Sequence, residues 1–275
     1  MELLKESDYF KVIEPLKQNK INILFARAVV EKYVPGKIYV DDKENPKSFY
    51  VVHPYGIVLI FGDHTNSAFN ASLVDYAFNT AKNREKEDWI IVPSDDWNNV
   101  IKEKFKGRIY DSTVTKPSGE SFIELNTRVN FKFNQKKYAE FKNSHNRTTD
   151  TIVRTDEKIF HEMNGMVIPK YFWENDEAFC KNGIGFSLFH EGKLASTAYS
   201  AFLIEDKLEL GIETVESFRG KGFAIEVCMQ LIDYSLENNF EPVWACKYEN
   251  QNSYKLAQKL GFEQVLMLPY YRLPV

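Results

Sequence analysis

The chain has 275 residues, of which 44% are hydrophobic and 27% are charged. This is the composition of an ordinary globular protein, and it excludes long disordered, collagen-like and coiled-coil classes. The 35 basic and 39 acidic side chains give a net charge of −4, which argues against nucleic acid as a partner and favours a small molecule or a protein.

The cysteines, the histidines and the first residues of the chain indicate whether disulfides, metal sites or a secretion signal are expected. Three cysteines form no Cys-x-x-Cys pair, and the five histidines show no paired ligand spacing, so we expect neither a disulfide framework nor a metal site. The first residues lack a secretion signal, and the longest apolar runs, such as 57–61, are too short to cross a bilayer. We therefore expect a cytoplasmic protein without membrane contact. The oligomeric state stays open, a homodimer included.

The first half predicts a layered α/β domain. Apolar residues at helical spacing from Phe10 to Val29 predict two short helices that end at Pro35-Gly36, and the pattern then changes to strands. A strand-helix-strand-helix order follows, which is typical of an α/β layer. The predicted elements after the first two helices are strands at 37–40, 49–53 and 56–61, a helix at 66–82, a strand at 89–92 and a helix at 94–104.

A polar stretch at 115–126 divides the chain, so we predict domains at 1–120 and 124–275. The second half contains three aromatic and aliphatic strands separated by short turns, which predict an antiparallel meander. A largely buried helix, a strand and a last helix ending at Gly261 come after it. The order of elements in the two halves is similar, so the first half is a candidate degenerate repeat of the second. The predicted elements are strands at 184–190, 193–203, 207–215 and 242–246 and helices at 223–237 and 250–260.

The segment between the third strand of this meander and the buried helix predicts an anion site. Gly220 and Gly222 flank Lys221, and the helix begins at once. The first turn of a helix has unpaired N–H groups, and glycines let a phosphate approach them. A Walker loop would need Ser or Thr where Gly222 stands, and a dinucleotide fingerprint would need a small residue where Ile225 stands. Both alternatives are disfavoured.

The same segment resembles the coenzyme A pyrophosphate loop of the GCN5-related N-acetyltransferase superfamily, Arg/Gln-x-x-Gly-x-Gly/Ala. Arg219, Gly222 and Ala224 match this pattern, and the stretch from Asn250 to 260–262 matches the spacing of its second coenzyme-proximal helix. The resemblance covers about 124–275. It implies a mixed, largely antiparallel sheet flanked by helices, and 171–173, 183–186 and 209–212 resemble the zwittermicin A resistance acetyltransferase branch.

The resemblance implies acetyl-coenzyme A as co-substrate and assigns the residues that would bind it. These are Thr214, Val215, Arg219, Gly220, Lys221, Gly222, Phe223, Ala224, Asn250, Asn252 and Ser253. Helix capping is the alternative role for Asn250. Backbone N–H groups near Val215 are expected to hydrogen-bond the acyl carbonyl.

Chemistry on an amine also needs a proton acceptor and a proton donor. An amine attacks a thioester only when it is neutral, so a carboxylate must take its proton directly or through water. Glu213 and Glu209 share one face of their strand and are the candidate bases, with a structural role as the alternative for each. The position where the family carries a tyrosine acid is Ala257, so water, Tyr254 or another group must serve.

The expected function is therefore acetyl transfer from acetyl-coenzyme A to a primary amine of a small molecule by direct attack. Ala257 makes a non-catalytic acyl-coenzyme A binding module a second possibility. A third is an acyltransferase that uses another acyl donor. The acceptor itself is not indicated by any motif.

Overall fold

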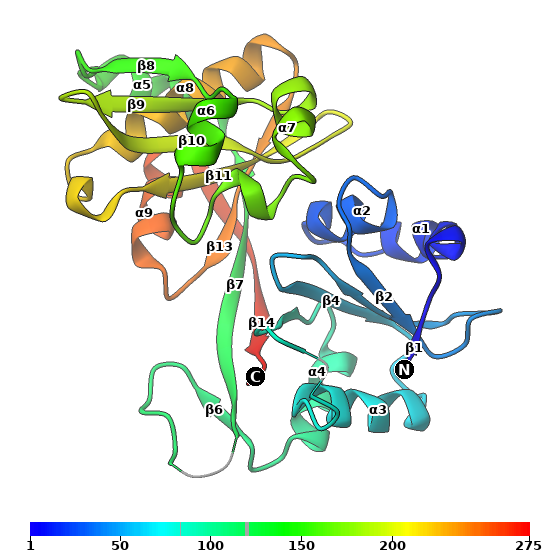
Figure 1. Ribbon diagram of the computed structural model, residues 1–275. Helices are drawn as coiled ribbons and strands as arrows, with labels where there is room; N and C mark the ends of the chain where they lie inside the picture. Colours follow the sequence, from blue (N-terminus) through cyan, green and yellow to red (C-terminus); the bar gives the residue numbers. More distant parts are fainter. Residues whose placement is uncertain (83, 119–120) are drawn as a thin grey trace. The chain divides into compact units, whose positions relative to one another are not determined.

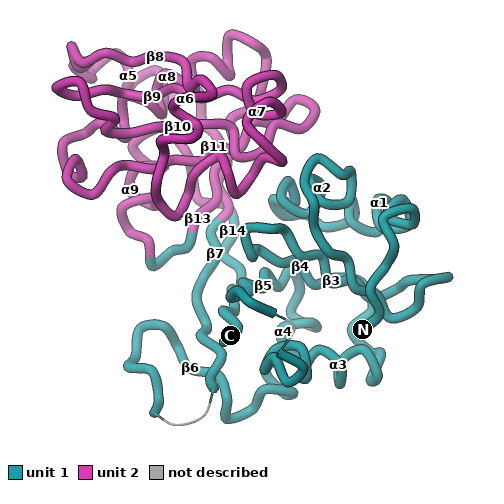
Figure 2. The backbone as a smooth tube through the Cα atoms, in the orientation of Figure 1, with its two compact units in different colours: residues 1–129, 247–249, 266–275 teal, residues 130–246, 250–265 magenta. Residues whose placement is uncertain are grey.

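The computed structural model describes residues 1–82, 84–118 and 121–275 and shows a mixed α/β protein with two sheets flanked by helices (Figure 1). The predicted fold class is confirmed. The chain forms two compact units, unit 1 (1–129, 247–249 and 266–275) and unit 2 (130–246 and 250–265) (Figure 2). Residue 120, where the first predicted domain ends, lies outside the described residues. The carboxy-terminal ten residues belong to unit 1, whereas the sequence placed them in the second domain.

Unit 1 is built on a mixed sheet in which the last strand of the chain takes a central place. The strand order is β1-β2-β3-β4-β5-β14-β7-β13, with β6 paired to β7. Tyr270 of β14 lies opposite Ile91 of β5 in an antiparallel pair, and β7, β13 and β14 contribute residues to both units. The strands are β1 (Glu2–Leu3), β2 (Lys37–Val40), β3 (Ser48–Val52), β4 (Ile57–Gly62), β5 (Trp89–Ile91), β6 (Ile109–Asp111), β7 (Ile123–Phe133), β13 (Ala245–Lys247) and β14 (Phe262–Arg272).

Helices cover both faces of β2 to β5, with α1 and α2 on one side and α3 and α4 on the other (Figure 1). Phe69 of α3, Trp97 of α4 and Phe105 directly after α4 join one buried cluster with Ile60 and Ile90 of the sheet. The two predicted amino-terminal helices and the two later ones are confirmed, but α2 ends before Pro35-Gly36 and α3 ends before residue 82. Their bounds are α1 (Phe10–Lys17), α2 (Leu24–Val30), α3 (Ser67–Ala77) and α4 (Asp95–Lys104), with a 3-10 turn η1 (Glu6–Asp8) before α1.

Unit 2 contains a second sheet with the order β12-β11-β10-β9-β8. The predicted meander is confirmed as β9, β10 and β11, while β8 completes the antiparallel part and β12 pairs with β11 in parallel. The strands are β8 (Thr151–Arg154), β9 (Gly185–His190), β10 (Lys193–Ile204), β11 (Lys207–Thr214) and β12 (Glu241–Val243). The helical elements are α5 (Gln135–Ser144), α6 (Glu157–Glu162), η2 (Pro169–Tyr171), α7 (Asp176–Asn182), η3 (Glu216–Phe218), α8 (Phe223–Glu237) and α9 (Gln251–Lys259).

The two faces of this sheet carry different helices. Phe186 of β9 contacts Tyr234 of α8, which places α8 on one face. Tyr199 of β10 contacts Phe179 of α7, which in turn contacts Phe160 of α6. Since successive strand residues point to opposite faces and Phe186 pairs with Ala198, α6 and α7 cover the face opposite α8.

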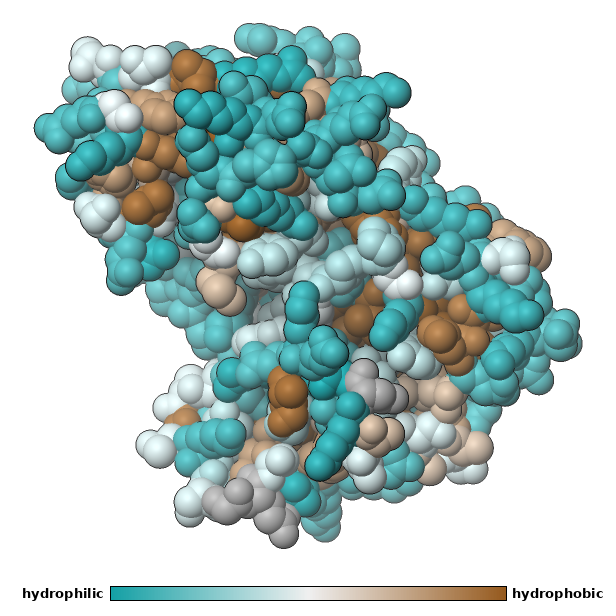
Figure 3. Space-filling view, viewed as in Figure 1, coloured by the Kyte–Doolittle hydropathy of each residue, from teal (hydrophilic) through white to brown (hydrophobic). Residues whose placement is uncertain are grey.

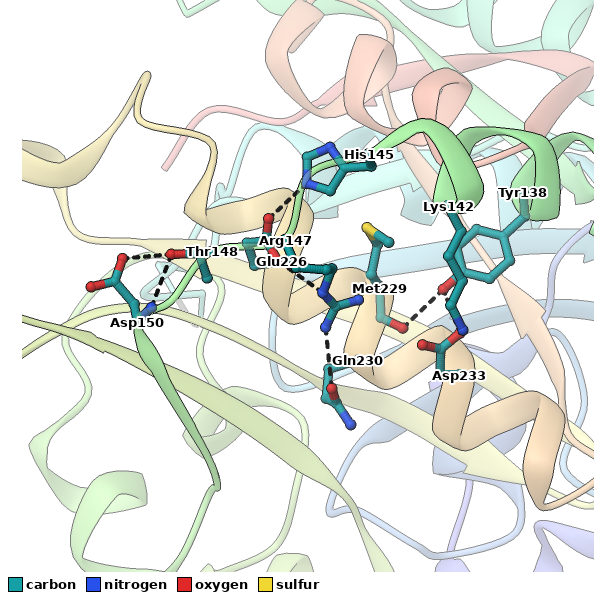
Figure 4. A network of polar contacts seen from close by, with 10 residues as sticks. All are labelled: Tyr138, Lys142, His145, Arg147, Thr148, Asp150, Glu226, Met229, Gln230 and Asp233. Atoms are coloured by element: carbon teal, nitrogen blue, oxygen red, sulfur yellow. Dashed lines mark hydrogen bonds and ion pairs between the residues drawn. The ribbon is translucent and has the colours of Figure 1, made fainter.

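The buried helix predicted at 223–237 is confirmed with the same bounds as α8. Its polar stripe, which favours a helix with one narrow polar face, consists of Glu226, Gln230, Asp233 and Glu237, and the first three contact α5 or the segment after it (Figure 4). Asp233 accepts a hydrogen bond from the Tyr138 hydroxyl at 2.7 Å and pairs with Lys142 at 2.8 Å. Two turns closer to the start of α8, Glu226 lies 2.6 Å from His145 Nε2. Glu226 and Asp233 therefore contact α5 and the residue that follows it, whereas Glu237 at the end of α8 is exposed.

Glu226 is the most buried carboxylate of this stripe, so its removal is expected to destabilise unit 2. Its side chain is 5% exposed, and its second partner is Arg147, whose Nε lies 3.1 Å from Oε2. Glu226→Ala leaves donors of His145 and Arg147 without an acceptor, and we expect a loss of about 1–3 kcal/mol in the free energy of unfolding. Urea denaturation measures it. The exposed Glu237 on the same helix is the control, and equal losses for Glu237→Ala and Glu226→Ala would contradict the expectation.

The predicted strand at 242–246 is interrupted. Trp244 separates β12, which pairs with β11, from β13, which joins the other sheet. The side chain of Trp244 is buried and donates its indole N–H to Ser253 Oγ at 3.2 Å. The chain therefore leaves the edge of β11 at this residue.

The large apolar side chains are mostly buried, and the face drawn in Figure 3 is largely hydrophilic with apolar side chains scattered over it.

None of the helices in the described part of the chain is both long and apolar enough to span a membrane.

Candidate functional site

The start of α8 differs from that of most other helices. In α3 to α7 and in α9 an Asn, Ser or Asp side chain caps the first turn, such as Asn66 before α3. The N-cap of α8 is Gly222, and no side chain among the described residues caps it. Gly220 and Gly222 both have positive φ, +79° and +88°, and an added Cβ would meet nothing within 4 Å at either. The first turn thus presents its N–H groups and its positive dipole end to an outside anion.

The edge of β11 next to this helix is open over its second half. In the described part of the chain, β11 pairs with β12 only at Lys207–Glu209, before Trp244 leads the chain away. The N–H of Val215 donates to Ala195 O of β10 at 3.0 Å. Among the N–H groups near Val215 that we expect to hydrogen-bond an acyl carbonyl, that of Val215 itself is occupied, because β10 already accepts its hydrogen. Strand alternation directs the N–H of Thr214 to the open edge instead.

A cavity of about 500 Å³ lies where β10 begins and β11 ends, against the segment that follows α6. The predicted residues Thr214, Val215, Arg219 and Glu213 line it. Three carboxylates and one guanidinium are among the lining groups, so the cavity favours a cation. Its lining residues are Glu162, Met163, Asn164, Gly165, Leu194, Ser196, Thr197, Glu213, Thr214, Val215, Glu216 and Arg219.

The Glu213 carboxylate has specific partners on both oxygens. Its Oε2 accepts hydrogen bonds from the main-chain N–H groups of Met166 and Val167, each at 2.9 Å. Its Oε1 lies 3.6 Å from the guanidinium of Arg219, which also donates from Nε to Thr214 O at 3.2 Å. The side chain is 12% exposed, and that of Arg219 is 59% exposed. Oε1 thus faces the exposed guanidinium, whereas Oε2 is held by the main chain.

Glu209 does not share this cavity, although it lies on the same face of β11. Between the two carboxylates stands Gly211, and a Cβ there would lie 2.5 Å from the ring of Tyr199. The Tyr199 ring therefore covers the strand between Glu209 and Glu213. Glu209 is buried and is absent from the described residues that line the cavity. The structure does not bring the two candidate bases into one cleft, because the tyrosine ring fills the space between them.

The other predicted residues lie in the loop and at the start of α9. Lys221 Nζ lies 5.1 Å from the centre of the Phe218 ring, and Phe223 and Ala224 are the first residues of α8. Asn250 caps α9 by accepting from Ser253 N at 3.2 Å, which is its alternative role, and Asn252 is exposed. These residues are not among the described lining of the cavity.

Tyr254, the side chain named as a candidate proton donor, does not reach the cavity, and Ala257 has no acidic proton to give. Ala257 is fully buried in α9. The Tyr254 hydroxyl donates to Gln264 Oε1 at 2.7 Å, and its ring packs against Phe131. Its proton is directed to β14, and Tyr254 is not among the described residues that line the cavity.

Sequence reasoning missed the segment after α6. Its contribution to the site comes from main-chain atoms of Met166 and Val167, which leave no mark in side-chain chemistry. The dipeptide Asn164-Gly165 is a turn signal that could have pointed to a close backbone approach.

One histidine lies among potential metal ligands. Ligand atoms of Glu157, His161 and Asp176 lie within 4.8 Å of one another. His161 Nε2 pairs with Asp176 Oδ2 at 2.8 Å. This hydrogen bond makes the largest contribution to lowering the pKa of the Asp176 carboxyl below its usual range. The hydrogen bond between His161 and Asp176 explains why these two side chains lie together, and a metal ion is not needed to explain it.

The model of a family described as GNAT acetyltransferase matches residues 14–271. The protein named Uncharacterized N-acetyltransferase YdfB from Bacillus subtilis (strain 168) is 28% identical over 250 residues, which are 90% of this chain and 89% of that protein.

Two solved structures share the fold. A GCN5-related N-acetyltransferase-like protein from Streptococcus suis 89/1591 superposes with a TM-score of 0.71 at 18% identity and covers 98% of this chain and 100% of its own. A tandem GNAT protein from the clavulanic acid biosynthesis pathway gives 0.61 at 8% identity, with 98% of this chain and 97% of that one covered. The second likeness agrees with the predicted repeat of the fold in the first half.

Proposed function

This chain belongs to the GNAT acetyltransferase family, and from that premise we propose that it transfers the acetyl group of acetyl-coenzyme A to a primary amine of a small molecule. The observation that carries the proposal is the uncapped start of α8 beside the open edge of β11 and a cavity that holds Glu213. Acetyl-coenzyme A supplies an activated thioester and a pyrophosphate. We also retain the zwittermicin A resistance-like branch as a proposal, on the motifs at 171–173, 183–186 and 209–212.

The loop before α8 suits a pyrophosphate. Gly220 and Gly222 leave space for close approach, and the first-turn N–H groups and Arg219 can donate to phosphate oxygens. Lys221, Phe223 and Ala224 complete this loop. Asn250, Asn252 and Ser253 remain proposed neighbours of the coenzyme at the start of α9.

The chemistry assigned to the cavity is proton removal and charge stabilisation. The carboxylates of Glu162, Glu213 and Glu216 attract an ammonium group. Glu213 Oε1 takes the proton of this group directly or through water, so that a neutral amine attacks. The N–H of Thr214 at the open edge donates to the acyl oxygen as negative charge develops on it. Water protonates the leaving thiolate, since Ala257 offers no acid.

Binding is tested by isothermal titration with coenzyme A. The proposal expects saturable binding, and absence of heat at millimolar ligand would overturn it. Release of free thiol, followed across amines that differ in charge, then tests transfer. Diamines and polyamines are expected to react faster than amino acids, whose carboxylate the acidic cavity repels.

A non-catalytic acyl-coenzyme A binding module is the second candidate, and one observation favours it. Position 257 carries a buried alanine where the family pattern carries an acid. Saturable coenzyme A binding without thiol release for any amine would support this candidate over transfer.

Tyr254→Phe is expected to leave the rate of thiol release within about twofold. The hydroxyl that is lost donates to Gln264 and does not line the cavity. Steady-state kinetics at saturating acetyl-coenzyme A measure the effect. A fall of a hundredfold or more, the range of a lost general acid, with unchanged coenzyme A affinity, would instead assign the proton donor to Tyr254.

A further inference from the structure

The segment after α6 touches the cavity carboxylate through three consecutive residues of its main chain. Met166 and Val167 donate their N–H groups to Glu213 Oε2. The Cα of Gly165 lies so close that an added Cβ would stand 2.5 Å from both Cδ and Oε2 of Glu213. The φ of Gly165 is +149°, a conformation that side chains rarely adopt. Two hydrogen bonds and one close contact thus converge on a single carboxylate group.

We propose that residues 165–167, which we name the carboxylate clamp, orient Glu213 for catalysis, and that Gly165 is the positioning residue which makes the clamp possible. This inference rests on the proposed function. The clamp occupies Oε2 completely with main-chain donors, so only Oε1 is left to accept the proton of the amine. Fixing the carboxylate plane in this way removes the cost of orienting it during the reaction.

The requirement for glycine follows from distance. A real Cβ does not approach a carboxylate carbon to 2.5 Å, so any other residue at 165 must push the Glu213 side chain or the segment away. Both responses break the bonds from Met166 and Val167, because these residues follow directly in the chain. Of the contacts that the described residues make to the Glu213 carboxylate, the one to the guanidinium of Arg219 would then remain.

The first test is Gly165→Ala with Gly192→Ala as the control. Gly192 also has positive φ, +73°, in the turn between β9 and β10, and an added Cβ there meets nothing within 4 Å. We expect Gly165→Ala to lower kcat about tenfold or more while the KM for acetyl-coenzyme A and the Kd of coenzyme A stay within twofold. Gly192→Ala is expected to keep all three. An unchanged kcat for Gly165→Ala, or a loss that follows coenzyme binding instead, would overturn the proposal.

A double-mutant cycle tests the clamp without using activity. Gly165→Ala is made in the natural protein and in Glu213→Ala, where the clashing atoms are gone, and the shift in the midpoint of urea unfolding is measured. The clamp predicts that the shift is at least halved in the Glu213→Ala background. Equal shifts in both backgrounds would show that Gly165 and Glu213 do not interact.

The two readouts separate the possible failures. If the protein releases no thiol but the cycle shows the coupling, the contact exists and the proposed function fails, and with it the catalytic role of the clamp. If thiol is released and Gly165→Ala has full kcat, the proposed function stands and the clamp is overturned.

Discussion

Replacing both Gly220 and Gly222 by alanine is expected to weaken coenzyme A binding at least a hundredfold, about 2.7 kcal/mol, while the protein still folds. The two added methyl groups meet nothing within 4 Å in the free protein. They occupy the space through which a pyrophosphate would reach the first turn of α8. The only cost to folding is the positive φ, about 1–2 kcal/mol per residue. Isothermal titration measures the affinity, and urea denaturation measures the stability.

The matched control replaces Gly107 and Gly192 by alanine. Their φ values, +77° and +73°, are close to those of the loop glycines, and an added Cβ again meets nothing within 4 Å. The control carries a similar strain but lies outside the loop, so it is expected to bind coenzyme A normally. If both double variants lose affinity equally, the effect comes from strain and the loop is not the anion site.

Glu213→Gln is expected to lower kcat at neutral pH by about a hundredfold to a thousandfold, the size of a lost general base. The amide keeps the volume of the side chain, so the cavity stays intact, but it cannot accept the proton of the acceptor amine. The residual rate of the variant is expected to rise as pH increases, because an amine with a pKa near 10 then becomes neutral without help. The natural enzyme is expected to show a shallower rise over the same range.

Glu237→Gln on the exposed end of α8 is the control for this change and is expected to keep the full rate. Thiol release at pH 7 and pH 9 with one amine acceptor compares the three proteins. A Glu213→Gln rate within threefold of the natural one at pH 7 would remove Glu213 as the base, and the cavity would then act only by binding.

The hydrophobic pattern of the sequence predicted those helices and strands that bury one face or that end at glycines or short turns. The helix α8 was predicted from its narrow polar stripe and its glycine start, and β9 to β11 from short turns between apolar runs. The strands β7 and β14 were not predicted. Buried polar residues interrupt the apolar pattern of β7, such as Asn126 and Asn130, and Pro269 stands inside β14.

The sequence predicted those parts of the candidate site that depend on the type of side chain or on the spacing of glycines. Arg219, Gly220 and Gly222 belong to a motif, and Glu213 could be placed on the correct face by strand alternation. The separation of Glu209 from Glu213 depends on the ring of Tyr199 above Gly211, a contact across two strands. The bonds from Met166 and Val167 are made by main-chain atoms, so side-chain chemistry does not predict them, and the turn signal Asn164-Gly165 indicates only where the chain bends.

The place of β14 limits how this protein can be taken apart. A fragment ending before residue 124 would lose the strand that pairs with β5 in the middle of its own sheet, since Tyr270–Arg272 come from the far end of the chain. It would present an unpaired apolar edge, which is prone to aggregate. A fragment made by dividing the chain at one position is therefore not expected to fold as unit 1. A stable form of unit 1 requires residues 266–275 to be joined to the first half by a linker.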